Sequence, residues 1–222
     1  NRIRMQIHKG FNQLPAFRNA VLSIGTYDGV HAGHQVIIQR LNEIASEING
    51  ESVLLTFDPH PRLVLQPNDP SLKLISIIEE KIQLLESFGL QHLVIAEFSK
   101  EFASMDAEKY VEDVLIQNFH PKKIIIGYDH RFGKGRTGDI HLLQKLGPKF
   151  GYDVEEISVQ TIDEISVSST KVRQSLALGD IKTANQYLAH PFTLSGKVVH
   201  GDKIGRTIGF PTANIQVMDA HK

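Results

Sequence analysis

Two histidines in a glycine-containing turn are the residues whose types and spacing most directly suggest chemistry. His31 and His34 lie three residues apart with Gly33 between them, within the segment Gly25–His34. Imidazole nitrogens at this spacing can project to one side of a turn and meet an anion together. A glycine, which has no Cβ, lets the backbone approach that anion closely. A zinc pair or two ordinary surface histidines are the other interpretations, but no third zinc ligand with suitable local context is evident.

The sequence around this turn predicts a site for a polyphosphate. The apolar run Ala20–Ile24 precedes the turn and has the character of a buried strand, and a helical pattern begins at Gln35. Backbone N–H groups at a helix N-terminus have no partner within the helix, and the helix dipole is positive there. We therefore expect nucleotide chemistry at this end of the strand.

A second group of candidate residues lies in the segment 166–173, where a helix is predicted to begin directly after a strand. Hydroxyl and N–H groups at such a start can receive phosphate oxygens. Arg173 lies about one turn later and offers a fork-shaped donor. Ordinary helix capping by serine and threonine is the competing interpretation. The hydroxyl residues concerned are Ser168, Ser169 and Thr170.

Strands and helices alternate along the first three quarters of the chain, which indicates right-handed crossovers and a parallel sheet buried on both faces. Ligands of such sheets bind beyond the carboxyl ends of the strands. The predicted strands are Ala20–Gly25, Ser52–Phe57, His92–Ala96, Lys123–Gly127 and Asp153–Val159. The predicted helices are Gln35–Ile48, Ile78–Phe88, Ala107–Asn118, Asp139–Phe150, Thr170–Leu178 and Ile181–Leu188.

The character of the chain changes after Pro191, where Thr193–Gly201 predicts a strand without a helix nearby. We place a domain boundary near residue 189, with domains 1–189 and 190–222. The few strands of the second domain would have unpaired edges, so we expect them to be poorly ordered or to lean on the first domain. The start without methionine and the end soon after this boundary suggest a piece of a longer protein. The loop Asp58–Ser71 contains four prolines and predicts a mobile surface segment.

Composition narrows the classes of partner. The formal net charge is −1, so no overall basic field would recruit nucleic acid or an anionic membrane. The chain has no cysteine, which excludes disulfides, thiolate metal sites and cysteine nucleophiles. It has no apolar run of about 18 residues and no signal-peptide core, so a cytoplasmic protein is expected. The oligomeric state is left open.

Taken together, these motifs resemble a known family. The patterns His-x-Gly-His and Ser-Ser-Thr-x-x-Arg resemble the two signatures of the nucleotidyltransferase superfamily. Within it, Thr56–Pro61 and Gly127–Gly133 resemble the bacterial bifunctional riboflavin kinase/FMN adenylyltransferases, also called FAD synthetases. The segment Gly205–Asn214 is similar to the first signature of their kinase domain. The resemblance implies a Rossmann-like nucleotidyltransferase domain followed by the start of a β-barrel kinase domain.

That resemblance implies two reactions with ATP: riboflavin gives FMN, and FMN then gives FAD and pyrophosphate. In the second reaction the FMN phosphate attacks the α-phosphorus directly, so positioning and charge stabilisation suffice. His31 and His34 would contact the ATP phosphates and stabilise the transition state. Ser168, Ser169, Thr170 and Arg173 would bind the phosphates that leave as pyrophosphate. Mg²⁺ bridging these oxygens is expected from the family.

Further roles follow by resemblance. Gly25, Tyr27 and Gly33 would join the ATP site, with Asp129 accepting hydrogen bonds from ribose or adenine. A departure follows Asp129, because His130 stands where the family usually has an aromatic residue. The expected flavin-binding residues are Asp58, Pro59 and His60, although His60 would equally suit a turn between two prolines.

Asp28 has no assigned contact with substrate. We expect it to orient a histidine or to hold the turn through backbone hydrogen bonds. Of these two roles, the structural one, in which Asp28 holds the turn, is the better supported.

In the kinase signature, Gly209 would shape the nucleotide loop, and Thr212 and Asn214 would bind Mg²⁺ and ATP phosphates. The glutamate base of the family's kinase barrel lies in a region beyond this sequence, so we expect this chain to adenylylate FMN without phosphorylating riboflavin. Two other functions remain open at this point. One is a nucleotidyltransferase with another acceptor, such as phosphopantetheine or nicotinamide mononucleotide. The other is a flavin- or nucleotide-binding regulatory module without turnover.

Overall fold

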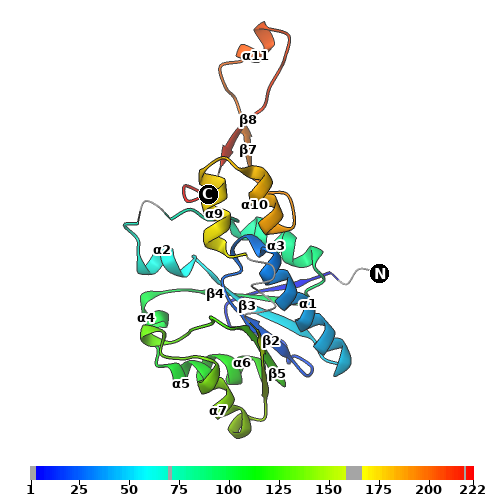
Figure 1. Cartoon of the computed structure of the whole chain (residues 1–222), viewed down its shortest axis with the longest axis vertical. Coiled ribbons are helices and arrows are strands. Elements are labelled where there is room, and N and C mark those ends of the chain that lie inside the picture. Colours follow the sequence, from blue (N-terminus) through cyan, green and yellow to red (C-terminus); the bar gives the residue numbers. More distant parts are fainter. Residues whose placement is uncertain (1–3, 70–71, 159–166, 218) are drawn as a thin grey trace.

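The central sheet of the α/β part consists of parallel strands (Figure 1). The structure is a computed structural model that describes residues 4–69, 72–158, 167–217 and 219–222. Within these residues the sheet order is β1-β4-β3-β2-β5-β6, and every neighbouring pair is parallel. The predicted α/β, Rossmann-like fold class is confirmed. The strands are β1 Gln6–Lys9, β2 Val21–Ile24, β3 Ser52–Asp58, β4 His92–Glu97, β5 Lys123–Gly127 and β6 Asp153–Ile157.

The order of the strands places a switch point beside β2. From β2 the chain moves outward to β3 and β4, and it then crosses to β5 on the other side of β2. The loops that follow β2 and β5 therefore leave in opposite directions, which opens a crevice at the carboxyl ends of these strands. The histidine turn follows β2 and so lies at this crevice.

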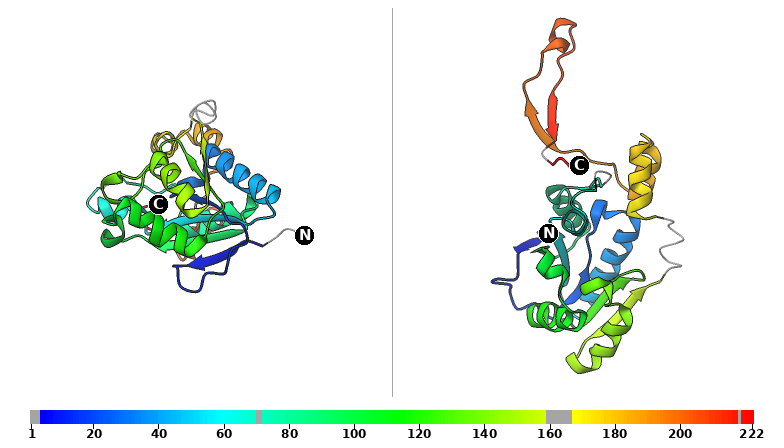
Figure 2. Two further views of the ribbon diagram at one scale, coloured as in Figure 1. Left: turned by 90° about the horizontal axis from the view of Figure 1, so that it is seen from below. Right: turned by 90° about the vertical axis from the view of Figure 1, so that its left-hand side faces the viewer.

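Helices cover both faces of the sheet (Figure 2). The helices α1 (Ala32–Glu47) and α3 (Ile78–Ser87) pack on one face, with Val21 and Leu54 of the strands. The neighbouring strand residues point to the opposite face, as the period of two requires. That face is covered by α7 (Ile140–Phe150) and by one continuous helical segment. The segment consists of α5 (Ala107–Lys109), the π-helical η2 (Tyr110–Ile116) and α6 (Gln117–Phe119).

The structure adds elements that the sequence did not predict. The edge strand β1 pairs with β4, and α4 (Lys100–Ala103) follows β4. The helix α2 (Pro61–Leu65) lies inside the segment predicted as a loop. Proline at its first position and the ring nitrogen of His60, which accepts a hydrogen bond from the Arg62 N–H at 3.1 Å, start this helix. Residues 70–71 of that loop and residue 159 of the last predicted strand lie outside the described residues.

Two helices lie above the carboxyl edge of the sheet, α9 (Ser169–Ala177) and α10 (Ile181–Leu188), as Figure 1 shows. The bounds predicted from the sequence for these two helices agree with the structure to within one residue at each end. Gly179, with φ +74°, ends the first, and the Asp180 carboxylate accepts a hydrogen bond from the Thr183 N–H at 3.0 Å. A small apolar cluster fastens these helices to the rest: Ile75, Val167, Val172 and Leu188.

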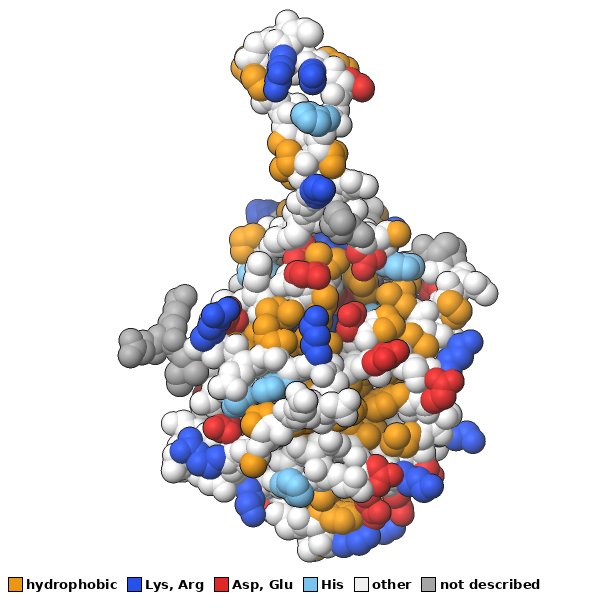
Figure 3. All heavy atoms as spheres, turned by 180° about the vertical axis from the view of Figure 1, so that it is seen from behind, with side chains coloured by type: hydrophobic (Ala, Val, Ile, Leu, Met, Phe, Trp, Pro, Cys, Tyr) orange, Lys and Arg blue, Asp and Glu red, His pale blue; other side chains and the backbone are white. Residues whose placement is uncertain are grey.

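A β-hairpin follows and stands away from the α/β part (Figures 1 and 2). It consists of the antiparallel strands β7 (Gly196–Val199) and β8 (Asn214–Val217), with α11 (Ile204–Thr207) between them. Its apolar side chains, among them Phe210, are exposed to solvent (Figure 3). A lone hairpin with this much exposed apolar surface is marginal in water.

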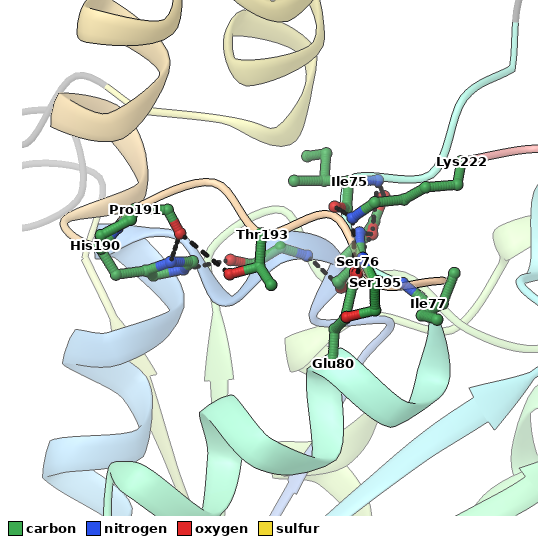
Figure 4. Close-up of polar contacts among 11 residues, drawn as sticks. Ile75, Ser76, Ile77, Glu80, His190, Pro191, Thr193, Ser195 and Lys222 are labelled. Carbon is green, nitrogen blue, oxygen red and sulfur yellow. Dashed lines mark hydrogen bonds and ion pairs between the residues drawn. The ribbon is translucent and has the colours of Figure 1, made fainter. Parts of the chain in front are cut away.

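The root of the hairpin is fastened to α3 by Glu80 (Figure 4). The Glu80 carboxylate accepts hydrogen bonds from the Ile77 N–H at 3.1 Å and the Ser195 N–H at 2.8 Å. It also pairs with the Lys222 ammonium at 2.5 Å, with both side chains buried. The expectation that the second segment leans on the first is met at its root, whereas the strands themselves project outward.

None of the helices in the described part of the chain combines the length and the apolar character that a membrane span requires.

Candidate active site

The turn after β2 is built around a buried tyrosine. Tyr27 adopts a left-handed conformation with φ 47°, and its hydroxyl lies 2.7 Å from the hydroxyl of Ser23. Its ring packs against Gly25, where a Cβ would come within 2.9 Å of the ring. The same ring also packs against the ring of His34, with 4.7 Å between the ring centroids. Tyr27 therefore supports a histidine with its side chain, and the close approach explains the glycine.

The two histidines of the turn stack on each other, with 3.6 Å between ring centroids. His31 precedes α1 as its N-cap, and its Nδ1 accepts a hydrogen bond from the His34 N–H at 3.4 Å. Gly33 lies buried between them in the first turn of α1. The His34 Nδ1 atom is buried and has no hydrogen-bond partner among the described residues. The turn thus presents two adjacent imidazoles, one with an unsatisfied nitrogen.

Both imidazoles are held neutral. Burial lowers the pKa of His31 to about 4, against an opposing effect of the Asp28 charge. Burial, together with the nearby His31 imidazole and the Lys81 charge, holds the pKa of His34 well below its ordinary value. Neutral rings avoid mutual repulsion at this distance, and each can donate one hydrogen bond to a phosphate oxygen.

The lowered pKa of His31 makes the folded protein less stable in acid. The unfolded chain binds the proton near pH 6.5 and the folded chain only near pH 4. This contribution is complete above the unfolded pKa and is lost as the pH falls through the folded pKa. At about pH 5 the free energy of unfolding should be lower by about 2 kcal/mol than at about pH 7.5, from His31 alone. Urea unfolding at both pH values measures this difference.

A variant pair isolates the part of this pH dependence that comes from His31. His31→Gln should remove that part, whereas His141→Gln, at an exposed position on α7, should keep the whole of it. An unchanged pH dependence in His31→Gln would show that the buried imidazole is not its source.

An ion pair joins the histidine turn to the late helix α9. The guanidinium of Arg173 contacts the Asp28 carboxylate at 2.5 Å, and its Nε donates to the carbonyl oxygen of Lys73 at 2.6 Å. Asp28 is 1% exposed and also accepts hydrogen bonds from the N–H groups of Ile75 and Ser76, at 3.0 and 2.9 Å. The structural role predicted for Asp28 is present, but its partners come from other segments. A guanidinium has five N–H donors, and two of those of Arg173 serve these contacts with the described residues, which leaves three for a ligand.

The start of α9 lies against the same turn. The Ser169 hydroxyl donates to the carbonyl oxygen of Asp28 at 3.4 Å, while Thr170 is exposed. Ser168 acts as the N-cap, accepting a hydrogen bond from the Lys171 N–H at 3.3 Å. The Ser168 side chain is therefore an ordinary helix cap, which was the competing interpretation of this motif. The first N–H groups of α9 have no helical partner and remain suited to anionic oxygens. Residue 166, the first of this motif, lies outside the described residues.

A cavity of about 230 Å³ opens beside Asp28. Two of the predicted flavin-binding residues line it, Asp58 and His60, together with the buried ring of Phe57. Pro59 lies between them in the chain at an exposed position. Burial lowers the pKa of His60, which also caps α2. The cavity therefore joins the expected flavin residues to the base of the histidine turn.

Asp129 lies elsewhere on the same edge of the sheet. It follows β5, the strand next to β2, and it is exposed. The neighbouring His130 turns its Nε2 into a buried position without a partner among the described residues. Its ring packs against Phe132 at 5.8 Å, and burial lowers the pKa of His130 to about 4. His130 thus packs as an aromatic ring would, despite the departure from the family's usual residue.

The predicted kinase residues are remote from this site. Gly209, Thr212 and Asn214 are exposed and belong to the hairpin that stands away from the sheet. Gly209 has φ +81°, a conformation that favours glycine.

Two residues of the site were not found from the sequence. The Ser76 hydroxyl accepts a hydrogen bond from the Gly29 N–H at 2.9 Å and thereby holds the histidine turn. Lys81 lines the cavity and is 4% exposed. A signal existed for Lys81, since it shares the buried face of α3 with Leu85, four residues on.

This fold and site define the α/β nucleotidyltransferase class, in which ligands meet at the switch point of a parallel sheet. The FAD synthetase family model matches residues 14–171, and the riboflavin kinase family model matches residues 188–222. The chain belongs to the FAD synthetase family of bifunctional riboflavin kinase/FMN adenylyltransferases, transferases of FAD biosynthesis, as its motifs predicted. Membership favours FMN over phosphopantetheine as the acceptor.

Individual relatives agree with this assignment. The bifunctional riboflavin kinase/FMN adenylyltransferase of Escherichia coli (strain K12) is 39% identical over 215 residues, covering 95% of this chain and 68% of that protein. The corresponding protein of Haemophilus influenzae is 36% identical, covering 96% of this chain and 69% of its own length. A crystal structure described as a macrolide-efflux protein from Streptococcus pneumoniae superposes with a TM-score of 0.80 at 30% identity, covering 98% of this chain and 70% of that one.

Proposed function

We propose that the site at the carboxyl ends of β2 and β5 transfers AMP from ATP to FMN. An oxygen of the FMN phosphate forms a bond to the α-phosphorus while the bond from that phosphorus to the β-phosphate oxygen breaks, giving FAD and pyrophosphate. No covalent enzyme intermediate is needed, so the residues of the chain act by positioning and by stabilising charge. Because ATP is the donor, we expect the protein to act in the cytoplasm.

The contact between Arg173 and Asp28 is the observation that carries this proposal. Asp28 and Arg173 lie 145 residues apart in the chain, yet their ion pair holds the histidine turn and α9 together at one edge of the sheet. The Ser169 hydroxyl adds a second link to the same turn. A triphosphate placed here would meet the two imidazoles, the start of α9 and the remaining donors of the guanidinium at once.

Individual roles follow from this placement. His31 and His34 donate to the oxygens of the reacting phosphorus, where negative charge grows in the transition state. Arg173, Ser169 and Thr170 hold the departing β- and γ-phosphates.

The remaining predicted residues fall into three groups. The expected ATP contacts are the backbone of Gly25, Tyr27 and Gly33, the start of α9 at Ser168, and Asp129 for the nucleoside. The expected flavin contacts at the cavity are Asp58, Pro59 and His60. The expected contacts of the kinase signature are Gly209, Thr212 and Asn214.

Magnesium fits this arrangement as a partner of the substrate phosphates. Among the described residues, no three His, Asp or Glu side chains form a metal cage. Mg²⁺ commonly keeps several waters and binds phosphate oxygens with few protein ligands. When bound, it would neutralise charge on the triphosphate. In the hairpin, the Thr212 hydroxyl and the Asn214 amide oxygen are hard donors that suit the same ion.

We also propose that the domains are residues 1–189 and 190–222. Helix α10 ends at Leu188, and the match to the riboflavin kinase model begins at residue 188. The first domain would carry adenylyl transfer.

A product analysis tests the function. With ATP, Mg²⁺ and FMN, the 222-residue chain should form FAD and pyrophosphate in equal amounts, detected by chromatography. With riboflavin as the sole acceptor, it should form no ADP, because the kinase residues lie on an exposed hairpin. Turnover with phosphopantetheine instead of FMN would contradict the proposed acceptor. Nucleotide binding without any pyrophosphate release would point to a regulatory module.

A further inference from the structure

Lys81 is a buried cation that the site as described does not use. It lies on α3, four residues before the fully buried Leu85, and it is only 4% exposed. Its side chain lines the cavity beside Asp28. Lysine is almost never buried to this degree without a partner, because removing an ammonium from water is costly.

Its ammonium makes no hydrogen bond and no ion pair with any residue in the described part of the chain. The preceding residue, Glu80, differs in this respect, and Figure 4 shows it among its donors. Glu80 takes part in an ion pair with Lys222 and accepts backbone hydrogen bonds, so its burial is compensated within the protein. The Lys81 ammonium has no such partner at hydrogen-bond distance among the described residues, and the charges of Asp28 and Asp58 act on it only from further away. Because Lys81 lines the cavity, an anion that enters the cavity would complete its surroundings.

The electrostatic surroundings place Lys81 between the two halves of the site. Its charge lowers the pKa of His34 on the nucleotide side and the pKa of His60 on the flavin side. Burial lowers the pKa of Lys81, while the charges of Asp28 and Asp58 act in the opposite direction. The ammonium is thus close to both groups of residues that the reaction must bring together.

We propose that Lys81 binds the phosphate group of FMN and holds it at the entrance to the histidine turn. This inference rests on the function proposed above and adds a residue to it. Two anions must approach each other in the reaction, and a fixed positive charge between them lowers their repulsion.

The acceptor phosphate is favoured over the donor triphosphate by the other residues nearby. The triphosphate already has Arg173 and the first turn of α9. On the cavity side, the ring of Phe57 and the expected flavin residues Asp58 and His60 line the cavity together with Lys81. These residues suit a flavin whose phosphate extends into the cavity. Lys81 is then the cation available to that phosphate within the cavity lining.

Lys81→Met tests the proposal, because methionine keeps the length and loses the charge. The KM for FMN should rise about 10- to 100-fold, the effect of losing a charged hydrogen bond, while the KM for ATP stays within about threefold. Calorimetric affinity for riboflavin, which lacks the phosphate, should stay unchanged. The midpoint of thermal unfolding should stay equal or rise, since the substitution removes a desolvated charge and breaks no hydrogen bond or ion pair with the described residues. A lysine with a merely structural role would give the opposite change in stability.

Lys145→Met is the matched control, because Lys145 is exposed on α7 and pairs with Glu108 at the surface. It should alter none of these quantities. If Lys81→Met yields no folded protein, the structural role is supported and the proposal is overturned. A rise in the KM for ATP instead of FMN, or an equal loss of riboflavin affinity, would also overturn it. Absence of FAD synthesis by the unaltered chain would refute the proposed function itself, independently of Lys81.

Discussion

Replacing Arg173 by methionine is expected to abolish most FAD synthesis and to lower the free energy of unfolding by about 3 kcal/mol. Asp28 is 1% exposed, and the guanidinium is its cationic partner at 2.5 Å. Without that partner the carboxylate keeps its backbone donors but remains a buried charge. The same guanidinium ties α9 to Lys73, so the start of α9 would also lose its place beside the histidine turn. Urea unfolding and initial rates of FAD formation measure the two effects.

A surface arginine provides the control for this substitution. Arg40 contacts Glu155 at 2.6 Å, but its side chain is 35% exposed. Arg40→Met should cost less than about 1 kcal/mol and should leave FAD synthesis unchanged. Equal destabilisation by the two substitutions would show that burial of the Asp28 pair has no special importance.

The double variant Asp28→Asn, Arg173→Met separates stability from catalysis. Asparagine removes the buried charge, so the double variant should be more stable than Arg173→Met alone. FAD synthesis should not recover, because the phosphates still lack the guanidinium. Recovered synthesis would mean that Arg173 acts only by holding the fold.

The periodic elements of this fold could be predicted because their sequences are apolar in the pattern that burial requires. Strand β5 and helix α10 have the predicted bounds, and β2 differs from its prediction by one residue at each end. Strand β1 was not predictable in the same way. Its residues Gln6–Lys9 are largely exposed, and it exists because it pairs with β4, more than eighty residues later. A partner so distant leaves no local pattern in the sequence.

The candidate site shows the same division between local and distant causes. The histidine turn and the start of α9 could be predicted, since each is a local motif at the end of a strand. The partners of Asp28 could not be predicted, because Ile75, Ser76 and Arg173 come from segments far along the chain. Likewise, the sequence marks Lys81 only as a charged residue on an amphipathic helix. The cavity that it lines arises where α3, the end of β3 and the histidine turn meet.

These distant contacts give the turn its rigidity. The backbone of Gly29 is held by Ser76 on one side and lies 2.9 Å from the ring nitrogen of His190 on the other. His190, which follows α10, thereby contacts the histidine turn itself. Preorganised donors cost little reorganisation during a reaction, which would suit the direct transfer proposed for this site.

Removing the histidines should have the largest effect on the rate. His31→Ala and His34→Ala should each lower kcat for FAD synthesis by about 10²–10³, because each removes a donor to the reacting phosphate. The KM for ATP should change far less, since the start of α9 and Arg173 still bind the triphosphate. Initial rates at saturating ATP and FMN measure the loss. Retention of kcat within tenfold in His34→Ala would exclude the catalytic role of this imidazole.

The double variant His31→Ala, His34→Ala tests whether the two rings act as a unit. Their centroids are 3.6 Å apart, and His31 caps the helix that carries His34, so loss of either ring should displace the other. The double variant should therefore lose at most about tenfold more than the worse single variant, rather than the product of the two losses. His120→Ala, at an exposed position before β5, is the control and should keep the full rate. Strictly multiplicative losses would show that the two imidazoles contact the nucleotide independently, and the stacked arrangement would then have no catalytic importance.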